Sequence, residues 1–225
     1  MSAATEKVER IDDTRAMPAV RGFLHRPSQS SGDALVLTHG AGSDCNAPLL
    51  VALADAFAES AIAVLRCDLP YRQARPHGPP HGSGAEDREG LRRAVEVLRE
   101  HARAGVFLGG ISYGGRQATM LAAEGSKVCD GLLVLSYPLH PPGKPEQLRT
   151  KHLSTIEVPA LFVSGSKDPF GSPEELEKAV KLVPTHPRLL IVEGAGHDLG
   201  FGRRARGKNN DLPQRIVTAF RDILK

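Results

Sequence analysis

Short apolar runs alternate along this chain with longer segments in which apolar residues recur every three or four positions. A continuous apolar run is typical of a strand buried on both faces, and the longer spacing is typical of a helix with one buried side. The strand-like runs cover residues 20–24, 34–38, 62–66, 105–108, 131–136, 159–164 and 189–192. The helix-like segments cover about 48–60, 83–104, 117–124, 172–183 and 212–224. Six or seven strands alternating with helices predict an α/β fold, in which a mainly parallel sheet carries helices on both faces.

Particular residues mark the starts of two predicted helices. Ser83 with Glu86 fits a capping box, and Ser172 is followed by Pro173 at the first helical position and Glu175 at the third. The last helix is expected to bury six apolar residues at helical spacing: Leu212, Ile216, Val217, Phe220, Ile223 and Leu224.

Between these elements lie two regions that we expect to be irregular. Residues 68–82 form a long loop rich in Pro and Gly, and residues 138–159 form a Pro-rich connection with room for one short helix. Loops of this length are usually functional or mobile. Residues 1–19 show little periodicity and are expected to be an N-terminal arm or an edge strand. Residues 20–225 are expected to form one domain.

Composition narrows the class of protein. With 225 residues, 40% hydrophobic and 24% charged, the chain can bury one substantial core. The net charge of +3 gives no reason to expect nucleic acid or a membrane as a partner. Three widely spaced cysteines argue against a disulfide framework and a metal site. The charged N-terminus lacks the apolar region of a signal peptide, so we expect a cytoplasmic protein with reduced thiols.

Ser112 stands between Gly110 and Gly114 in the pattern G-x-S-x-G. An apolar run precedes it and a segment rich in helix formers follows, so the context is strand, sharp turn and helix. This is the arrangement of a nucleophile elbow, in which a strained serine protrudes between two closely packed elements. Because the chain contains 23 glycines, the pattern alone is weak evidence. A serine nucleophile also needs a histidine base and a carboxylate.

Both partners follow later strands. Asp168 comes after the run 159–164, and His197 comes after the run 189–192. The carboxyl ends of parallel strands lie at one edge of a sheet, so these side chains are expected to meet Ser112 there. The order Ser112, Asp168, His197 is one in which such triads occur, with His197 as general base and acid and Asp168 orienting it. Asp198 is a rival acid, but it is adjacent to His197 and poorly placed to orient it.

The transition state of acyl transfer also requires hydrogen-bond donors for an oxyanion. The backbone N–H of Tyr113 and that of Ala41 or Gly42 are the expected donors. Four further residues are candidates to line the site: His39, Tyr71, Ile111 and Arg116. His39 is more readily explained as a positioning residue of its loop. Arg116 falls in the first turn of a helix, where the dipole disfavours a cation, so a carboxylate or a substrate anion is expected beside it.

These segments together resemble the α/β-hydrolase superfamily: 34–42, the Ser112 elbow, 165–168 and 194–197. The small size resembles its dienelactone-hydrolase-like branch, whose nucleophile is Cys rather than Ser. His39-Gly-Ala-Gly, Leu69-Pro-Tyr-Arg, Gly109-Gly-x-Ser-x-Gly-Gly-Arg and Gly196-His resemble more closely a small family of hydrolase-like domains. Those domains occur in bacteria, in testis-expressed proteins and in a chromatin-acetyltransferase subunit. The likeness covers roughly residues 20–224 and implies an α/β-hydrolase fold and a serine hydrolase reaction. Ile111 and Tyr113 stand where that family is expected to carry Arg and Met.

The resulting prediction is a serine hydrolase that cleaves a small carboxylic ester, thioester or lactone through an acyl-enzyme on Ser112. It is expected to use no cofactor or metal, to act on a small-molecule acyl substrate, and to be a monomer or homodimer. Many relatives insert a lid domain where this chain has residues 138–159, a segment too short for one, so an open site is expected. The alternative is a catalytically idle hydrolase-fold module that binds or scaffolds partners. A peptidase is a third possibility, but the peptidases of this fold usually carry a large gating domain, and this chain does not contain one.

Two further clusters have alternative explanations. His77 and His81 have the spacing of a metal-binding pair, but they lie in a Pro/Gly loop without an apparent third ligand. The basic stretch 203–208 follows His197 and would either overhang the site, favouring an anionic substrate, or form a solvated loop.

Overall fold

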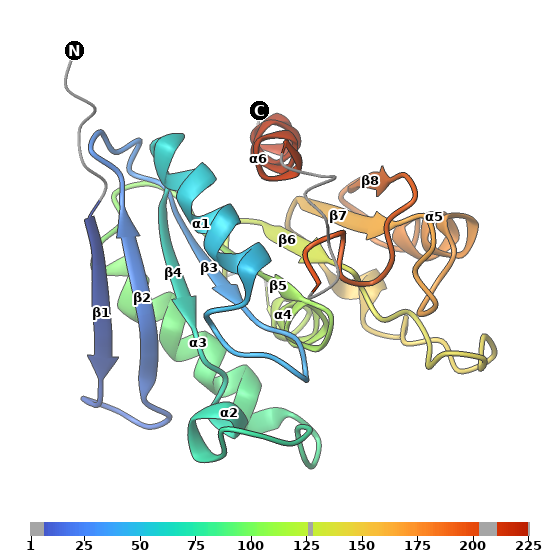
Figure 1. The fold of residues 1–225 in the computed structure, drawn as a ribbon, viewed down its shortest axis with the longest axis horizontal. Coiled ribbons are helices and arrows are strands. Elements are labelled where there is room, and N and C mark those ends of the chain that lie inside the picture. The colour runs from blue at the N-terminus through green and yellow to red at the C-terminus, as the bar shows by residue number, and fades with distance from the viewer. Residues whose placement is uncertain (1–6, 126–127, 203–210, 225) are drawn as a thin grey trace.

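The computed structural model describes residues 7–125, 128–202 and 211–224, which form an eight-stranded sheet with helices on both faces (Figure 1). The strand order is β1-β2-β4-β3-β5-β6-β7-β8. The strands are β1 (Lys7–Asp13), β2 (Val20–Arg26), β3 (Ala34–Thr38), β4 (Ala63–Cys67), β5 (Val106–Ile111), β6 (Leu132–Leu135), β7 (Ala160–Gly165) and β8 (Arg188–Val192). In this order, the strands from β4 through β3, β5, β6 and β7 to β8 are all parallel to their neighbours. Strand β2 is antiparallel to both of its neighbours, β1 and β4. The predicted α/β class and mainly parallel sheet are confirmed.

Two apolar cores lie on opposite faces of this sheet. Helices α1 (Pro48–Glu59) and α6 (Leu212–Ile223) cover one face, and α3 (Ala85–Arg99), α4 (Tyr113–Ala122) and α5 (Pro173–Val180) cover the other (Figure 1). Side chains alternate between the faces: Leu35 and Leu37 of β3 join the core under α1, while Val36 joins the core under α3. Burial on both faces explains why β3 is a continuous apolar run.

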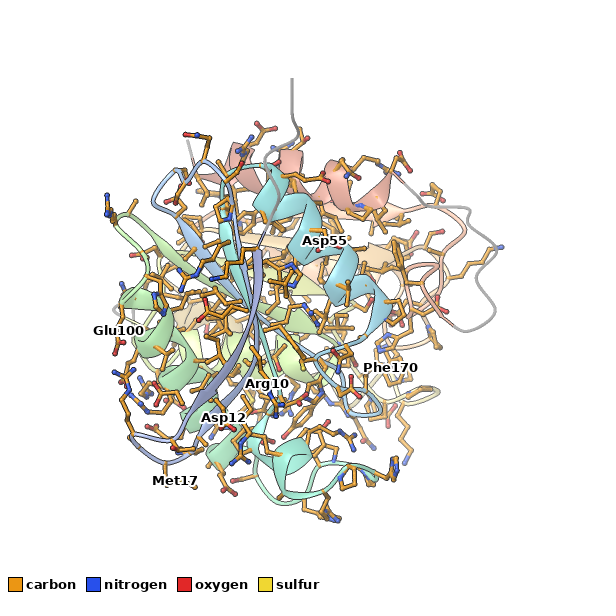
Figure 2. All side chains as sticks on the ribbon, turned by 60° about the vertical axis from the view of Figure 1, so that its left-hand side comes forward. Arg10, Asp12, Met17, Asp55, Glu100 and Phe170 are labelled. Carbon is orange, nitrogen blue, oxygen red and sulfur yellow. The ribbon has the colours of Figure 1, made fainter. Side chains whose placement is uncertain are left out.

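The strand count exceeds the prediction because β1 is a charged strand without an apolar run. Its side chains Arg10 and Asp12 are exposed, and Figure 2 shows them on the edge strand. Charges on an edge strand oppose pairing with another chain. The pattern could not distinguish such a strand from an arm, since neither face of β1 is fully buried.

Three details of the helices differ from prediction. The stretch 68–82 contains a short helix, α2 (Pro70–Ala74), which has Pro at its first position. The Ser83 capping box is not formed, because Gly84 takes the N-cap position with φ 72°. In the last helix Ile223 is only half-buried, as is Leu224 beyond its end.

At the start of α5 the predicted cap is present. The Ser172 hydroxyl accepts a hydrogen bond from the Glu175 N–H at 3.3 Å, and the Glu175 carboxylate accepts one from the Ser172 N–H at 2.8 Å. This is a reciprocal capping box. Along the Pro-rich connection, the expected short helix is a single 3₁₀ turn, Leu153–Thr155.

The topology brings two loops together at the carboxyl edge of the sheet. Strand β3 pairs with β4 on one side and with β5 on the other, so the connections leaving β3 and β5 diverge there. Thr38 is in register with Gly110, which sets residues 39–42 beside the Ser112 elbow. No helix in the described parts of the chain is long and apolar enough to span a membrane.

Candidate active site

Ser112 lies on a strained turn between β5 and α4. Its φ is 52° and its ψ −113°, a backbone conformation that non-glycine residues rarely adopt. The Ser112 N–H donates to the Leu135 carbonyl at 2.8 Å, which holds the turn against β6. A Cβ on Gly114 would overlap the His39 carbonyl oxygen, so glycine permits the β3 loop to approach the elbow.

His197 is hydrogen-bonded to both other residues of the predicted triad. Its Nε2 lies 2.8 Å from the Ser112 Oγ, and its Nδ1 lies 2.8 Å from the Asp168 Oδ2. The Asp168 side chain is 1% exposed, and its other oxygen accepts a hydrogen bond from the Phe170 N–H at 2.9 Å. The rival Asp198 is exposed and accepts from the Gly200 N–H at 3.0 Å. The geometry therefore favours Asp168 as the carboxylate partner of His197.

Backbone bonds between two loops hold this pair in place. The Ser166 N–H donates to the Val192 carbonyl at 3.1 Å, and the Lys167 N–H donates to the Ala195 carbonyl at 2.9 Å. In return, the Gly194 N–H donates to the Ser166 hydroxyl at 2.8 Å. The loops after β7 and β8 are thus joined along their length, which sets the distance between Asp168 and His197.

Phe170 is a site residue that the sequence analysis did not identify. Its ring centroid lies 4.2 Å from that of His197, with the planes tilted by 33°. Phe170, labelled in Figure 2, is half-buried and covers one face of the imidazole. The only available signal was its place two residues after Asp168, which does not reveal where the ring packs.

His39 does not line an open site, contrary to its inclusion among the lining candidates. It is 0% exposed, its Nε2 accepts a hydrogen bond from the Leu69 N–H at 3.1 Å, and its Nδ1 lies 2.9 Å from the Gly40 carbonyl. Since Nε2 accepts, the proton is on Nδ1 and is donated to Gly40. Burial lowers the pKa of His39, which favours this neutral form. His39 positions the loop.

Tyr71 and Arg72 fix the carbonyl groups of the same loop. The Tyr71 hydroxyl lies 3.2 Å from the Gly40 carbonyl and 3.0 Å from the Ala41 carbonyl. The Arg72 Nη2 donates to the Ala41 carbonyl at 3.0 Å. In a trans peptide the N–H points opposite to the preceding C=O, so these bonds also orient the N–H groups of Ala41 and Gly42. Within the described residues the Gly42 N–H has no hydrogen-bond partner.

Next to this loop is a cavity of about 600 Å³. It is lined by Ala41, Gly42, Ser43, Asp44, Arg72 and residues 76–79. The lining combines small residues of the 41–43 segment with the charged side chains of Asp44 and Arg72. Arg72 and residues 76–79, which the sequence predicts to be part of a loop, therefore lie next to the candidate site.

Arg116 has no carboxylate partner among the described residues, although one was an expected alternative. It is half-buried, and its Nε atom is buried without an acceptor. Burial, followed by the charges of Arg116 and Arg88, lowers the pKa of His152 to about 4. Burial and then Arg116 also lower the pKa of Arg149. Arg88 is paired with the Glu124 carboxylate at 2.9 Å, whereas Arg116 adds a positive charge beside the elbow that no acid among the described residues neutralises.

The remaining candidates are less informative. Ile111 is half-buried and packs against the core under α1 and α6. His77 is exposed in its loop. Among the residues that the structure describes, no group of three or more His, Cys, Asp or Glu side chains could hold a metal ion. The basic stretch 203–208 lies outside the described residues.

Comparison with known proteins agrees with this architecture. A dienelactone hydrolase from Anabaena variabilis has a TM-score of 0.75 at 20% identity, covering 96% of this chain and 98% of that one. An alpha-beta serine hydrolase homologue from Coxiella burnetii has a TM-score of 0.73 at 16% identity, covering 97% and 99%. A serine hydrolase without lid from Xanthomonas campestris has a TM-score of 0.70 at 16% identity, covering 99% and 96%. At these identities the likeness concerns the fold.

The narrower resemblance to testis-expressed proteins and an acetyltransferase subunit stays a prediction. The broader one is confirmed, because the family model described as an alpha/beta hydrolase domain matches residues 31–225. The chain therefore belongs to the alpha/beta hydrolase domain family.

Proposed function

We propose that this protein is a serine hydrolase that cleaves a small carboxylic ester, thioester or lactone through an acyl-enzyme on Ser112. The observation that carries the proposal is the bridging position of His197, 2.8 Å from both the Ser112 Oγ and the Asp168 Oδ2. These are the distances at which an imidazole exchanges a proton with a hydroxyl while a carboxylate holds its tautomer. Membership in a hydrolase family and structural likeness to serine hydrolases support the same reaction class.

In the first half-reaction the Ser112 Oγ attacks the substrate carbonyl carbon as its proton passes to the His197 Nε2. Asp168 stabilises the resulting imidazolium through Nδ1–H. The carbonyl π electrons move to oxygen, and this oxyanion is bound by the N–H of Tyr113 and that of Ala41 or Gly42. The bond from carbon to the leaving group then breaks, and the leaving group takes the proton from Nε2. Ser112 is left acylated.

In the second half-reaction water attacks the acyl carbon while His197 accepts its proton. The bond between the carbon and the Ser112 Oγ breaks, and the serine recovers a proton from Nε2. The acid is released and the enzyme returns to its starting state. Every proton in this cycle passes through His197, so the reaction needs no group beyond the substrate and water.

The substrate is inferred to be compact. The connection 138–159 holds only one 3₁₀ turn and has no helical lid, so nothing in it could enclose a long acyl chain. The cavity of about 600 Å³ beside residues 41–44 is large enough for a small acyl or leaving group. Phe170 adds an apolar surface next to His197.

The experiment is labelling with a fluorophosphonate, followed by mass spectrometry of the acyl adduct formed from p-nitrophenyl acetate. Both adducts are expected on Ser112 and should be absent from Ser112→Ala. Ser28→Ala is the matched control, because Ser28 is exposed in the loop after β2, at the edge of the sheet opposite to Ser112. Equal labelling of Ser112→Ala and the unaltered protein contradicts the proposal. Absence of any adduct or turnover over a panel of short-chain esters and thioesters favours an idle binding module instead.

A further inference from the structure

Asp87 is a buried carboxylate that pairs with no described cation. It is 3% exposed, lies in the first turn of α3, and takes part in no ion pair within the described residues. Its two oxygens are instead used by hydrogen bonds from two other elements. A buried carboxylate is costly unless such bonds compensate for lost hydration. The helix N-terminus contributes further stabilisation. The two hydrogen bonds that compensate for this burial connect Asp87 to Tyr71 and to Tyr113.

The first bond reaches the elbow. The Tyr113 hydroxyl donates to the Asp87 Oδ2 at 2.6 Å, a short distance typical of a charge-assisted bond. Burial raises the pKa of Tyr113, and the bond to Asp87 raises it further, so the hydroxyl remains a donor. Tyr113 follows the nucleophile directly, and its backbone N–H is one proposed oxyanion donor. Asp87 thus anchors the side chain of the residue whose main chain would bind the oxyanion.

The second bond reaches the loop that carries the other donor. The Tyr71 N–H donates to the Asp87 Oδ1 at 3.1 Å. The hydroxyl of Tyr71 contacts the carbonyls of Gly40 and Ala41, which orient the following N–H groups. The Tyr71 and Tyr113 rings pack edge to face, with centroids 5.7 Å apart and planes at 88°. One carboxylate therefore joins both halves of the proposed oxyanion hole.

We infer that Asp87 is a positioning residue that sets the distance between the two halves of the oxyanion hole through Tyr71 and Tyr113. The inference rests on the proposed serine hydrolase function and extends it to a residue that touches no substrate. It also accounts for Tyr at position 113, since an apolar side chain there could not reach the carboxylate with a hydrogen bond.

The test uses Tyr113→Phe and Asp87→Ala in the full-length protein, assayed on an ester and on its thionoester, in which sulfur replaces the carbonyl oxygen. Sulfur is larger and a weaker acceptor, so a well-set oxyanion hole stabilises the oxygen substrate more strongly. Tyr113→Phe is expected to lower kcat on the ester about 10- to 100-fold with KM within about twofold. On the thionoester the loss should be smaller, so the ester-to-thionoester ratio falls. A double variant should lose little more than Asp87→Ala alone, because both changes remove the same bond.

Tyr137→Phe is the matched control. Its hydroxyl donates to the Arg149 carbonyl at 2.5 Å and bonds neither to residues 39–42 nor to α3, so its loss should leave the ratio unchanged. Asp87→Asn should recover part of the activity lost in Asp87→Ala, because the amide oxygen can accept the Tyr71 N–H while the amide NH₂ donates to the Tyr113 hydroxyl oxygen. If Asp87→Ala fails to fold, as thermal unfolding would show, Tyr113→Phe and Asp87→Asn decide the matter.

Two failures are distinguishable. If turnover requires Ser112 but Tyr113→Phe retains the ratio of the unaltered protein, or loses both substrates equally, the positioning role of Asp87 is wrong and the hydrolase stands. If turnover does not depend on Ser112, the proposed function is wrong and this inference is wrong with it.

Discussion

Replacing Asp168 by Asn tests the proposed mechanism at the atom where the structure makes the outcome most specific. Of the two Asp168 oxygens, Oδ1 accepts the Phe170 N–H at 2.9 Å and Oδ2 faces the His197 Nδ1 at 2.8 Å. An asparagine would keep its oxygen on the Phe170 N–H, because an amide NH₂ cannot accept that bond. Its NH₂ would then face His197 and donate to Nδ1. The neutral imidazole would carry its proton on Nε2, the atom that must accept the Ser112 proton.

The expected loss follows from this exchange of tautomers. Removing the base function while leaving the site in place lowers kcat by about 10⁴ in serine proteases, which corresponds to about 5 kcal/mol of activation free energy. A similar loss is expected here, because the Asp168 side chain is 1% exposed and solvent cannot easily substitute for its charge. The volume of the side chain is unchanged, so thermal unfolding should move little.

The assay is steady-state hydrolysis of p-nitrophenyl acetate, with the rate of fluorophosphonate labelling as a second measure of the Ser112 nucleophile. Asp198→Asn is the matched control, since its exposed oxygen can still accept the Gly200 N–H. Its activity should stay within about twofold of the unaltered protein. A loss below tenfold in Asp168→Asn would refute the reasoning, and a large loss in Asp198→Asn would move the acid to the neighbouring position.

Three further predictions concern substrate charge, pH and helix capping. Arg116→Gln should raise KM about tenfold for esters that carry a carboxylate and leave neutral esters within about twofold in steady-state kinetics; equal changes would contradict an anion contact. The pKa of His152 is lowered from 6.5 to about 4, chiefly by burial. As the pH falls from about 6.5 towards 4, His152 therefore takes up a proton in the unfolded chain but not in the folded one. The free energy of unfolding should drop on acidification, and His152→Gln should lessen that drop in urea titrations at pH 7.5 and 5, whereas the exposed His77→Gln should not. Ser172→Ala should cost about 1 kcal/mol of unfolding free energy in thermal melts, whereas Ser83→Ala, which removes no cap, should cost less than about 0.5 kcal/mol.

Most of the fold could be predicted because its strands are buried on both faces. Continuous apolar runs such as 34–38 mark such strands without any alignment, and β3 has the predicted bounds. The failures occur where the physical signal is local and weak. In α2, Pro70 opens a helix inside a stretch whose Pro and Gly content indicates a loop. At α3, Gly84 adopts a left-handed conformation and displaces Ser83 from the capping position. Neither the short helix nor the position of the cap depends on hydrophobic periodicity, so the apolar pattern could not predict them.

The residues of the proposed triad could be predicted from the sequence for a different reason. Ser112, Asp168 and His197 each follow a predicted strand, and parallel strands present their carboxyl ends at one edge, so order and topology together bring them near each other. Their supporting residues have no such rule. Asp87 serves the elbow from 25 residues away in the chain, and an acid in the first turn of a helix is explained by the helix dipole alone. Phe170 likewise depends on side-chain packing that spacing does not reveal.

Two glycines connect the fold with the proposed chemistry. Gly114 and Gly165 do not adopt positive φ, so turn conformation does not require glycine at either position. Space does: a Cβ on Gly114 would overlap the His39 carbonyl oxygen, and one on Gly165 would overlap that of Ala195. The first contact sets the loop after β3 against the elbow, and the second sets the loop after β7 against the loop after β8. An alanine at either position could be accommodated only by moving one loop away from the other. These two glycines therefore let the loops at the carboxyl edge of the sheet pack closely, and this packing fixes where Ser112, Asp168 and His197 lie relative to one another.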